Sequence, residues 1–142
     1  MVKRILIAGA SGGLGNTLFK ALSQDYEVLG TCYQHSQPHL RPLDLRDADA
    51  TEQLLAEFQP DLLINTVAWT DVDGCEKDVR KAFALNLEST LSLRLAIAAH
   101  PCKLIHISTN DIFSGGPGRF DENDRPDPIN FYARTKYMAE QL

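Results

Sequence analysis

Short apolar runs alternate along the chain with segments whose apolar residues recur every three or four positions. The runs are typical of strands buried on both faces of a sheet. We predict strands over residues 4–8, 26–32, 61–65 and 103–108. The intervening segments are typical of amphipathic helices. This alternation predicts an α/β protein.

Two helices are predicted in the first half of the chain. The first begins at Gly13, and the second is signalled by Asp49 with Glu52 three residues later and ended by Pro60. The expected buried face of the first helix consists of Leu14, Leu18, Ala21 and Leu22.

The second half carries one long helical pattern and one irregular stretch. Residues 76–99 keep helical spacing, with room for one break. Their apolar stripe consists of Val79, Phe83, Leu87, Leu91, Leu95 and Ala98. Between Asn110 and Asn130 the chain is rich in Gly, Pro and Asp and is longer than an ordinary connection, which predicts a substrate loop or lid. A last helix begins at Asn130.

The order of these elements predicts the topology. Strands separated by helices indicate a parallel sheet, because each parallel connection must cross over and helical crossovers cover the faces. We therefore expect one domain over residues 1–142, a Rossmann-type doubly wound parallel sheet with helices on both faces. Ligands of such sheets bind at the carboxyl ends of the strands.

Three glycines stand at the turn between the first predicted strand and the first predicted helix. The first permits a tight turn, the second lets the backbone approach a pyrophosphate, and the third lets helix and strand pack closely. The helix N-terminus then faces the anion. A plain turn is the alternative, and the flanking strand and helix favour nucleotide binding. The residues assigned to the dinucleotide here are Gly9, Ser11, Gly12, Gly13, Leu14 and Gly15.

The choice between NAD and NADP depends on the residues after the second predicted strand. NAD-binding units often place Asp or Glu about 20 residues beyond the glycines, where it binds the ribose 2′-hydroxyl. Residues 31–36 contain no acid that would repel a 2′-phosphate, and they contain no arginine. We therefore expect a nicotinamide dinucleotide as cofactor and favour NADP over NAD.

Tyr132 and Lys136 are four residues apart in a segment predicted to be helical, so both side chains project from one face. An ammonium near a phenol stabilises the phenolate and lowers the pKa of the tyrosine toward working pH, which suits the acid in a carbonyl reduction. When the spacing alone is considered, a Tyr/Lys pair on the helix surface is the commoner explanation of this pattern. The other motifs of the chain favour the catalytic interpretation.

Composition and charge exclude several partners. The formal net charge of −5 and the lack of a dense Lys/Arg block argue against nucleic acid and against an anionic membrane surface. No segment approaches the roughly 20 apolar residues that a membrane span requires. The apolar run over residues 5–8 is too short for a secretory signal. We expect a cytoplasmic protein with a small-molecule ligand.

The cysteines and histidines indicate neither a disulfide framework nor a metal site. Cys32, Cys75 and Cys102 are odd in number and widely spaced, which predicts reduced thiols in the core. The four histidines show no paired ligand spacing on one helix face. We assign no metal.

Several motifs together resemble a known family. Their order and approximate spacing are those of an extended short-chain dehydrogenase/reductase, over essentially the whole chain. They are the segment 9–15, Asp44-Leu45, the segment 65–68, Ser108-Thr109 and the Tyr132/Lys136 pair. Residues 65–75, 108–113 and 130–136 are most similar to the dTDP-4-dehydrorhamnose reductase group, an RmlD-like substrate-binding family that also includes the regulatory subunit of methionine adenosyltransferase.

This resemblance implies a reaction and a role for three residues. The reaction is hydride transfer from NADPH to the 4-keto group of a nucleotide-activated sugar. Tyr132 is implied as the proton donor, and Lys136 as the residue that binds the nicotinamide ribose and tunes the tyrosine. Thr109 is implied as the hydroxyl that holds the substrate carbonyl, and strand-end structure is its simpler alternative.

The resemblance also implies contacts with the rest of the cofactor. Asp44 and Leu45 match the adenine site of the family, and Ala68 matches a residue that lines the cofactor groove. The simpler alternatives are a turn cap for Asp44 and plain core for Ala68.

The chain departs from the family pattern in two ways. Asn110 and Asp111 stand where the reductases usually have Asp-Tyr, a difference that bears on sugar recognition. Family members run to about twice this length, and their C-terminal half supplies most of the nucleotide-sugar pocket. We therefore expect this chain to be truncated before the substrate-binding region and to stop at Leu142 inside a helix without a capping residue.

Two functions follow from these observations. The first is an NAD(P)-dependent reductase, at best a feeble catalyst in this short form. The second is an inactive NAD(P)-binding regulatory or scaffold subunit of the same family. In either case we expect apolar surface around Tyr137, Met138 and Leu142, covered by self-association or by a partner subunit.

Overall fold

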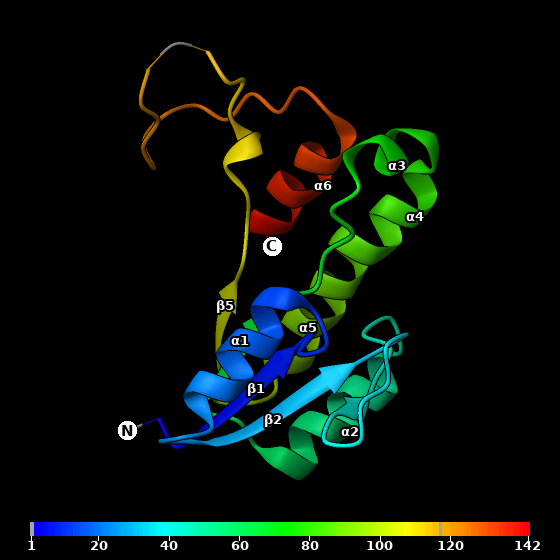
Figure 1. The fold of residues 1–142 in the computed structure, drawn as a ribbon, viewed down its shortest axis with the longest axis vertical. Helices are drawn as coiled ribbons and strands as arrows, with labels where there is room; N and C mark the ends of the chain where they lie inside the picture. The colour runs from blue at the N-terminus through cyan, green and yellow to red at the C-terminus, as the bar shows by residue number, and fades with distance from the viewer. Residues whose placement is uncertain (1, 117) are drawn as a thin grey trace. The chain divides into compact units, whose positions relative to one another are not determined.

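The computed structural model describes residues 2–116 and 118–142 (Figure 1). Its strands form one sheet in the order β3-β2-β1-β4-β5, and every neighbouring pair is parallel. The strands are β1 (Arg4–Ala8), β2 (Glu27–Cys32), β3 (Arg41–Pro42), β4 (Leu62–Asn65) and β5 (Lys103–His106). The four predicted strands are confirmed, whereas β3 was not predicted. The strand order reverses at β1, which is the switch point where such sheets bind ligands.

Six α-helices lie in the described part of the chain, with one π-helical turn (η1) and one 3₁₀ turn (η2). Their bounds are α1 (Gly13–Leu22), α2 (Ala48–Phe58), α3 (Val72–Lys77), α4 (Val79–Phe83), η1 (Ala84–Glu88), α5 (Ser89–Ile97), η2 (Asn110–Ile112) and α6 (Phe131–Glu140). The chain divides into two compact units. The sheet unit comprises Met1–Val67 and Ser89–Ile107, and the α6 unit comprises Ala68–Glu88 and Ser108–Leu142.

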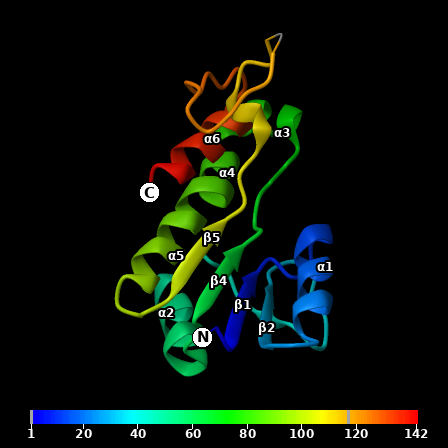
Figure 2. The same ribbon diagram turned by 90° about the vertical axis from the view of Figure 1, so that its left-hand side faces the viewer.

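The sheet unit has helices on both faces of the sheet, as predicted. Leu6 and Ala8 of β1 join a core that includes residues of α2 and α5. Ile5 and Ile7 lie on the opposite face, in a core against which α1 packs. Figure 2 shows α1 on one side of the strands and α2 and α5 on the other. The Rossmann-type fold class is therefore confirmed.

The predicted buried face of α1 is partly wrong. Leu14 and Ala21 are exposed, whereas Leu18 and Leu22 pack against the sheet as expected. Gly15 is buried against the backbone of the turn, so it fixes which side of α1 faces the strands. Residues three, four and seven positions beyond Gly15 share that side, and Leu14 is rotated away by about 100°.

The later helices differ from the prediction in their caps and faces. Asp47, rather than Asp49, caps α2, because its Oδ1 accepts from the Ala50 amide at 3.0 Å. The long helical pattern is broken at Asp78, which ends α3 and caps α4. In α5 the expected stripe is wrong, since Leu95 is 65% exposed. The π-helical turn η1 adds residues to one turn and shifts the face of everything beyond it.

The last helix begins where the sequence predicts, with Asn130 as its cap. It ends at Glu140, and Gln141 follows as its C-cap. The side chains of Met138 and Leu142 are exposed, as expected, and Tyr137 is half-buried.

Candidate functional site

The turn between β1 and α1 is crowded at two of its glycines. Gly9 has a φ of +83°, and a Cβ there would lie 2.9 Å from Oγ1 of Thr66. A Cβ at Gly15 would overlap the carbonyl oxygen of Gly9. The Thr66 hydroxyl donates to the Ala8 carbonyl at 2.7 Å and lies 3.3 Å from that of Gly9. Thr66 therefore holds the turn closed, a role that the sequence did not reveal.

The same turn is open at Gly12 and Gly13. A Cβ at Gly13 would meet nothing within 4 Å, and one at Gly12 would make an ordinary contact of 3.4 Å with the Gly9 carbonyl. Gly12 is the N-cap of α1 and offers no side chain to the first amides of the helix. Ser11 and Leu14 flank this opening, half-buried and exposed respectively. The packing of the protein does not require glycine here, whereas an anion at the helix N-terminus would use the space.

The carboxyl end of β2 lies beside this turn. The Ala10 amide donates to the Thr31 carbonyl at 2.8 Å. Asp44 follows β3, and its side chain accepts a hydrogen bond from the Arg46 amide at 3.0 Å. Asp44 therefore caps a turn, as the simpler alternative predicted. Hydrogen bonds from Arg46 are the main cause that holds the pKa of Asp44 below its ordinary value. The Leu45 side chain is buried in the core, so only its backbone is available to a ligand.

A buried amide fixes the carboxyl ends of β4 and β5. Asn65 is fully buried, and its Nδ2 donates to Oγ1 of Thr90 at 3.2 Å. The same nitrogen lies 3.1 Å from Nδ1 of His106. Its Oδ1 accepts from the Val67 amide at 3.0 Å and directs the chain away from the strand. All polar atoms of this side chain are thus bonded, as burial requires.

The α6 unit brings the three predicted catalytic residues together. Tyr132 and Lys136 lie one turn apart on α6, and their exposed fractions are only 8% and 1%. Tyr132 packs against Cys75 and Ala82. Thr109, whose Oγ1 caps η2, lies close enough to the Tyr132 phenol to lower the pKa of that group. The surface alternative for the Tyr/Lys pair is therefore wrong, because both side chains are buried.

Burial decides the charge states of this pair. It raises the pKa of Tyr132 above its ordinary value, since the phenolate is poorly solvated, and the Thr109 hydroxyl offsets only part of this effect. Burial also lowers the pKa of Lys136 to about 8, with partial compensation by Glu140. The expectation of a lowered tyrosine pKa is thus wrong in direction, because loss of hydration dominates and the negative charges of Asp111 and Cys75 act in the same direction.

A buried asparagine that the sequence analysis missed supports α6. Asn86 lies on η1, and its Oδ1 accepts from the Trp69 amide at 2.7 Å. Its Nδ2 donates to the Trp69 carbonyl at 3.2 Å and to Oγ1 of Thr135 at 3.0 Å. The Thr135 hydroxyl in turn donates to the Tyr132 carbonyl at 2.7 Å. A polar residue within an apolar helical segment was the available signal, and π-helical turns often mark functional sites.

The remaining predicted features lie in or next to the α6 unit. Ala68 opens this unit and is half-buried rather than in the core, so the plain-core alternative is wrong. The stretch predicted to be irregular, residues 110–130, begins with the 3₁₀ turn η2, and its described residues beyond Ile112 form neither helix nor strand. This stretch has contacts of its own, since the rings of Phe113 and Phe120 stack with centroids 4.8 Å apart.

Metal-binding clusters and membrane-spanning helices are both absent from the described residues. Within residues 2–116 and 118–142, no group of three or more His, Cys, Asp or Glu side chains is placed to hold a metal ion. In the same ranges, no helix is both long and apolar enough to cross a bilayer. Cys32, Cys75 and Cys102 are free thiols, and only the first two are buried as predicted.

Comparisons with known proteins place these observations in context. The family model described as the RmlD substrate binding domain matches residues 3–142. A structure of a hypothetical dTDP-4-dehydrorhamnose reductase from Sulfolobus tokodaii is 37% identical and superposes with a TM-score of 0.91 over 97% of this chain and 50% of that one. A dTDP-4-dehydrorhamnose reductase from Bacillus anthracis str. Ames, solved in complex with NADP, is 31% identical, with a TM-score of 0.89 over 99% of this chain and 49% of that one.

A third relative is named as a subunit of another enzyme and not as a reductase. Methionine adenosyltransferase 2 subunit beta from Danio rerio is 32% identical over 98% of this chain and 43% of its own length. The chain therefore spans about half the length of the relatives it matches.

Proposed function

Because this chain belongs to the RmlD substrate binding domain family, we propose that it binds a nicotinamide dinucleotide and prefers NADP to NAD. The open backbone at Gly12 and Gly13 and the uncapped N-terminus of α1 support a pyrophosphate at the β1–α1 turn. The NADP bound to the Bacillus anthracis relative supports the class of cofactor. In this proposal residues 1–142 act as one dinucleotide-binding domain, with Asp44, Leu45 and Ala68 toward the cofactor.

The chemistry we assign to the α6 unit is reduction of the 4-keto group of a nucleotide-activated sugar. The observation that carries this assignment is the buried tyrosine with a buried lysine one turn away and the Thr109 hydroxyl beside its phenol. The bound cofactor supplies the hydride. The chain's own residues supply and position the proton that the carbonyl oxygen receives.

Tyr132 is the proton donor in this scheme. Its raised pKa keeps the phenol protonated at neutral pH, which is the form a donor needs. The Thr109 hydroxyl, which lies beside that phenol, holds the substrate carbonyl. Lys136 gains its proton below about pH 8 and then presents an ammonium that binds ribose hydroxyls. The irregular stretch over residues 110–130 serves as the substrate loop.

NADPH oxidation in the presence of a dTDP-4-keto-6-deoxy sugar tests this function. Because the chain spans half of its relatives, we expect slow turnover, below roughly 1 per second, for the wild type. Tyr132→Phe should lower that rate about 100-fold or more, as loss of general acid catalysis does. The matched control is Tyr137→Phe, five residues further along α6, which should leave the rate unchanged. Wild-type turnover that survives Tyr132→Phe would remove Tyr132 from the reaction.

The second candidate is a regulatory subunit that binds the cofactor without turnover. The similarity to methionine adenosyltransferase 2 subunit beta favours it. Measuring NADPH binding and turnover on the same preparation separates the two candidates. Saturable NADPH binding without turnover above the Tyr132→Phe background supports the regulatory role. Turnover above that background supports the reductase.

A further inference from the structure

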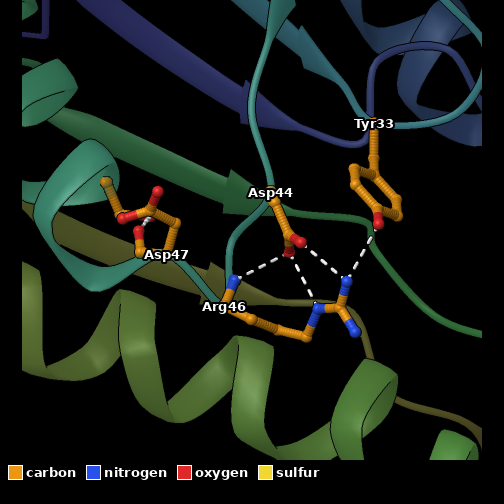
Figure 3. A network of polar contacts seen from close by, with 5 residues as sticks. Tyr33, Asp44, Arg46 and Asp47 are labelled. Atoms are coloured by element: carbon orange, nitrogen blue, oxygen red, sulfur yellow. Dashed lines mark hydrogen bonds and ion pairs between the residues drawn. The ribbon is translucent and has the colours of Figure 1, made fainter.

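An arginine side chain lies at the carboxyl end of β2, although the residues next to this end in the sequence include no arginine. Residues 31–36 include no arginine, yet Arg46 reaches this place from the segment between β3 and α2. Its Nη2 donates to Oη of Tyr33 at 2.9 Å, and Tyr33 directly follows the last residue of β2 (Figure 3). The guanidinium also lies over the Tyr33 ring, with its Cζ 5.4 Å from the centroid.

Asp44 holds this guanidinium in one orientation. The Asp44 carboxylate accepts from Nε at 2.9 Å and from Nη2 at 2.6 Å, a bidentate pair, while it also accepts from the Arg46 amide at 3.0 Å (Figure 3). This pair raises the pKa of Arg46, so the cation is permanent. The bonds from the guanidinium to other described residues come from Nε and Nη2, which leaves Nη1 available, and the Arg46 side chain remains 38% exposed.

The geometry of the sheet places this cation near the adenosine end of a dinucleotide. Ile7 of β1 lies opposite Gly30 of β2, so the two parallel strands end at the same edge. The hydrogen bond from Ala10 to Thr31 joins the glycine turn to that end of β2. With its pyrophosphate at the N-terminus of α1, a dinucleotide extends its adenosine ribose across the end of the second strand.

The geometry points to Arg46 and Tyr33 as the residues that bind the 2′-phosphate of NADP and thereby distinguish it from NAD. This inference rests on the proposed dinucleotide site. Nη1 of Arg46 offers two N–H donors, and the Tyr33 hydroxyl, which accepts from Arg46, keeps its own hydrogen for a phosphate oxygen. A phosphate monoester carries a charge of about −1.5 to −2 near pH 7, whereas the 2′-hydroxyl of NAD carries none. Only NADP therefore gains from the fixed cation.

The competing interpretation is a structural one, in which Asp44 and Arg46 only secure the turn before α2. Loss of the arginine would then weaken the turn and affect both cofactors alike. The pairing also occupies Asp44: both carboxylate oxygens face Arg46, so this acid is not free to accept the 2′-hydroxyl as the acid of an NAD site does. The two interpretations therefore differ in the ratio of affinities, not in the affinity for one cofactor.

Calorimetric titration of the 142-residue chain with NADPH and NADH, and with 2′,5′-ADP and 5′-AMP as probes of the adenosine end, tests the inference. Arg46→Gln should weaken NADPH and 2′,5′-ADP at least tenfold, about 1.4 kcal/mol, and should change NADH and 5′-AMP less than twofold. Tyr33→Phe keeps the ring at a half-exposed position and should cost NADPH two- to fivefold only. The matched control is Arg41→Gln, since Arg41 is an exposed arginine on β3 paired with Glu57 at 3.2 Å. It should change neither affinity.

The outcomes separate this inference from the proposed function. Selective loss of NADPH in Arg46→Gln and Tyr33→Phe supports it. Parallel loss of both cofactors, or no loss, overturns it while the dinucleotide site stands. A wild-type chain that binds neither cofactor contradicts the proposed function, and the inference falls with it. If Arg46→Gln does not fold, as judged by thermal unfolding, the Tyr33→Phe ratio decides in the same way.

Discussion

The glycine turn of the sheet unit and the catalytic group of the α6 unit reach function by opposite means. At the turn, backbone is left bare: Gly12 and Gly13 are exposed, and their missing side chains leave space at the N-terminus of α1. In the α6 unit, polar side chains are buried: Lys136 is among the least exposed residues described, and burial shifts its pKa and that of Tyr132. The glycine turn therefore lowers the stability of the fold very little, whereas burial of the Tyr132/Lys136 pair lowers it.

The largest effect should come from Gly15, one of the two crowded glycines of the turn, where packing rather than ligand access requires glycine. Gly15→Ala places a Cβ against the backbone of Gly9 and Ala10, which cannot move as a flexible side chain does. We expect a loss of about 3 kcal/mol in the free energy of unfolding, measured by urea denaturation. Gly13→Ala is the control, because its Cβ meets nothing, and it should change stability by less than about 1 kcal/mol. Equal losses in both variants would contradict this division of the glycines.

Replacement of the buried Lys136 should have a smaller effect, of opposite sign, on the free energy of unfolding. The pKa of Lys136 is about 8 in the folded chain and 10.5 without burial, so between these pH values the unfolded chain binds more protons. Stability should therefore rise with pH through this window, and the cost should be fully present below pH 8. Lys136→Met should raise the free energy of unfolding at pH 7 by about 2 kcal/mol and abolish the slope.

Lys77→Met is the control for that experiment, since Lys77 is an exposed lysine of α3 in the same unit. It should leave both the stability and the slope between pH 8 and 10.5 as in the wild type. A Lys136→Met variant that retains the wild-type slope would show that another group titrates in this range.

The sequence predicted those parts of the molecule that depend on neighbouring residues. The apolar runs of the strands, the glycine turn and the spacing of Tyr132 and Lys136 are all local patterns, and each was placed on its element. β3 was not predicted because it consists of only two residues, both exposed. The face of α1 was misjudged because the backbone contact at Gly15, rather than the apolar stripe, orients the helix.

What depends on tertiary structure was not predictable from local pattern. Asn86 bonds Thr135, which is 49 residues away, and the π-helical turn that carries Asn86 leaves no signature in apolar spacing. Arg46 reaches Tyr33 across 13 residues, so a search of the segment after β2 alone finds no cation. The pKa of Tyr132 was misjudged for the same reason, because burial is a property of the folded chain.

Calorimetric titration of the wild-type chain and of Gly12→Val with NADPH tests the central claim most directly. Gly12 is extended, at φ −79° and ψ 166°, a conformation that valine adopts readily, so the variant should fold as the wild type does. Its side chain would occupy the space that the phosphates need at the N-terminus of α1. We predict saturable binding of one NADPH per chain by the wild type and none by Gly12→Val. Equal affinity of the two proteins would contradict the assignment of this turn as the dinucleotide site.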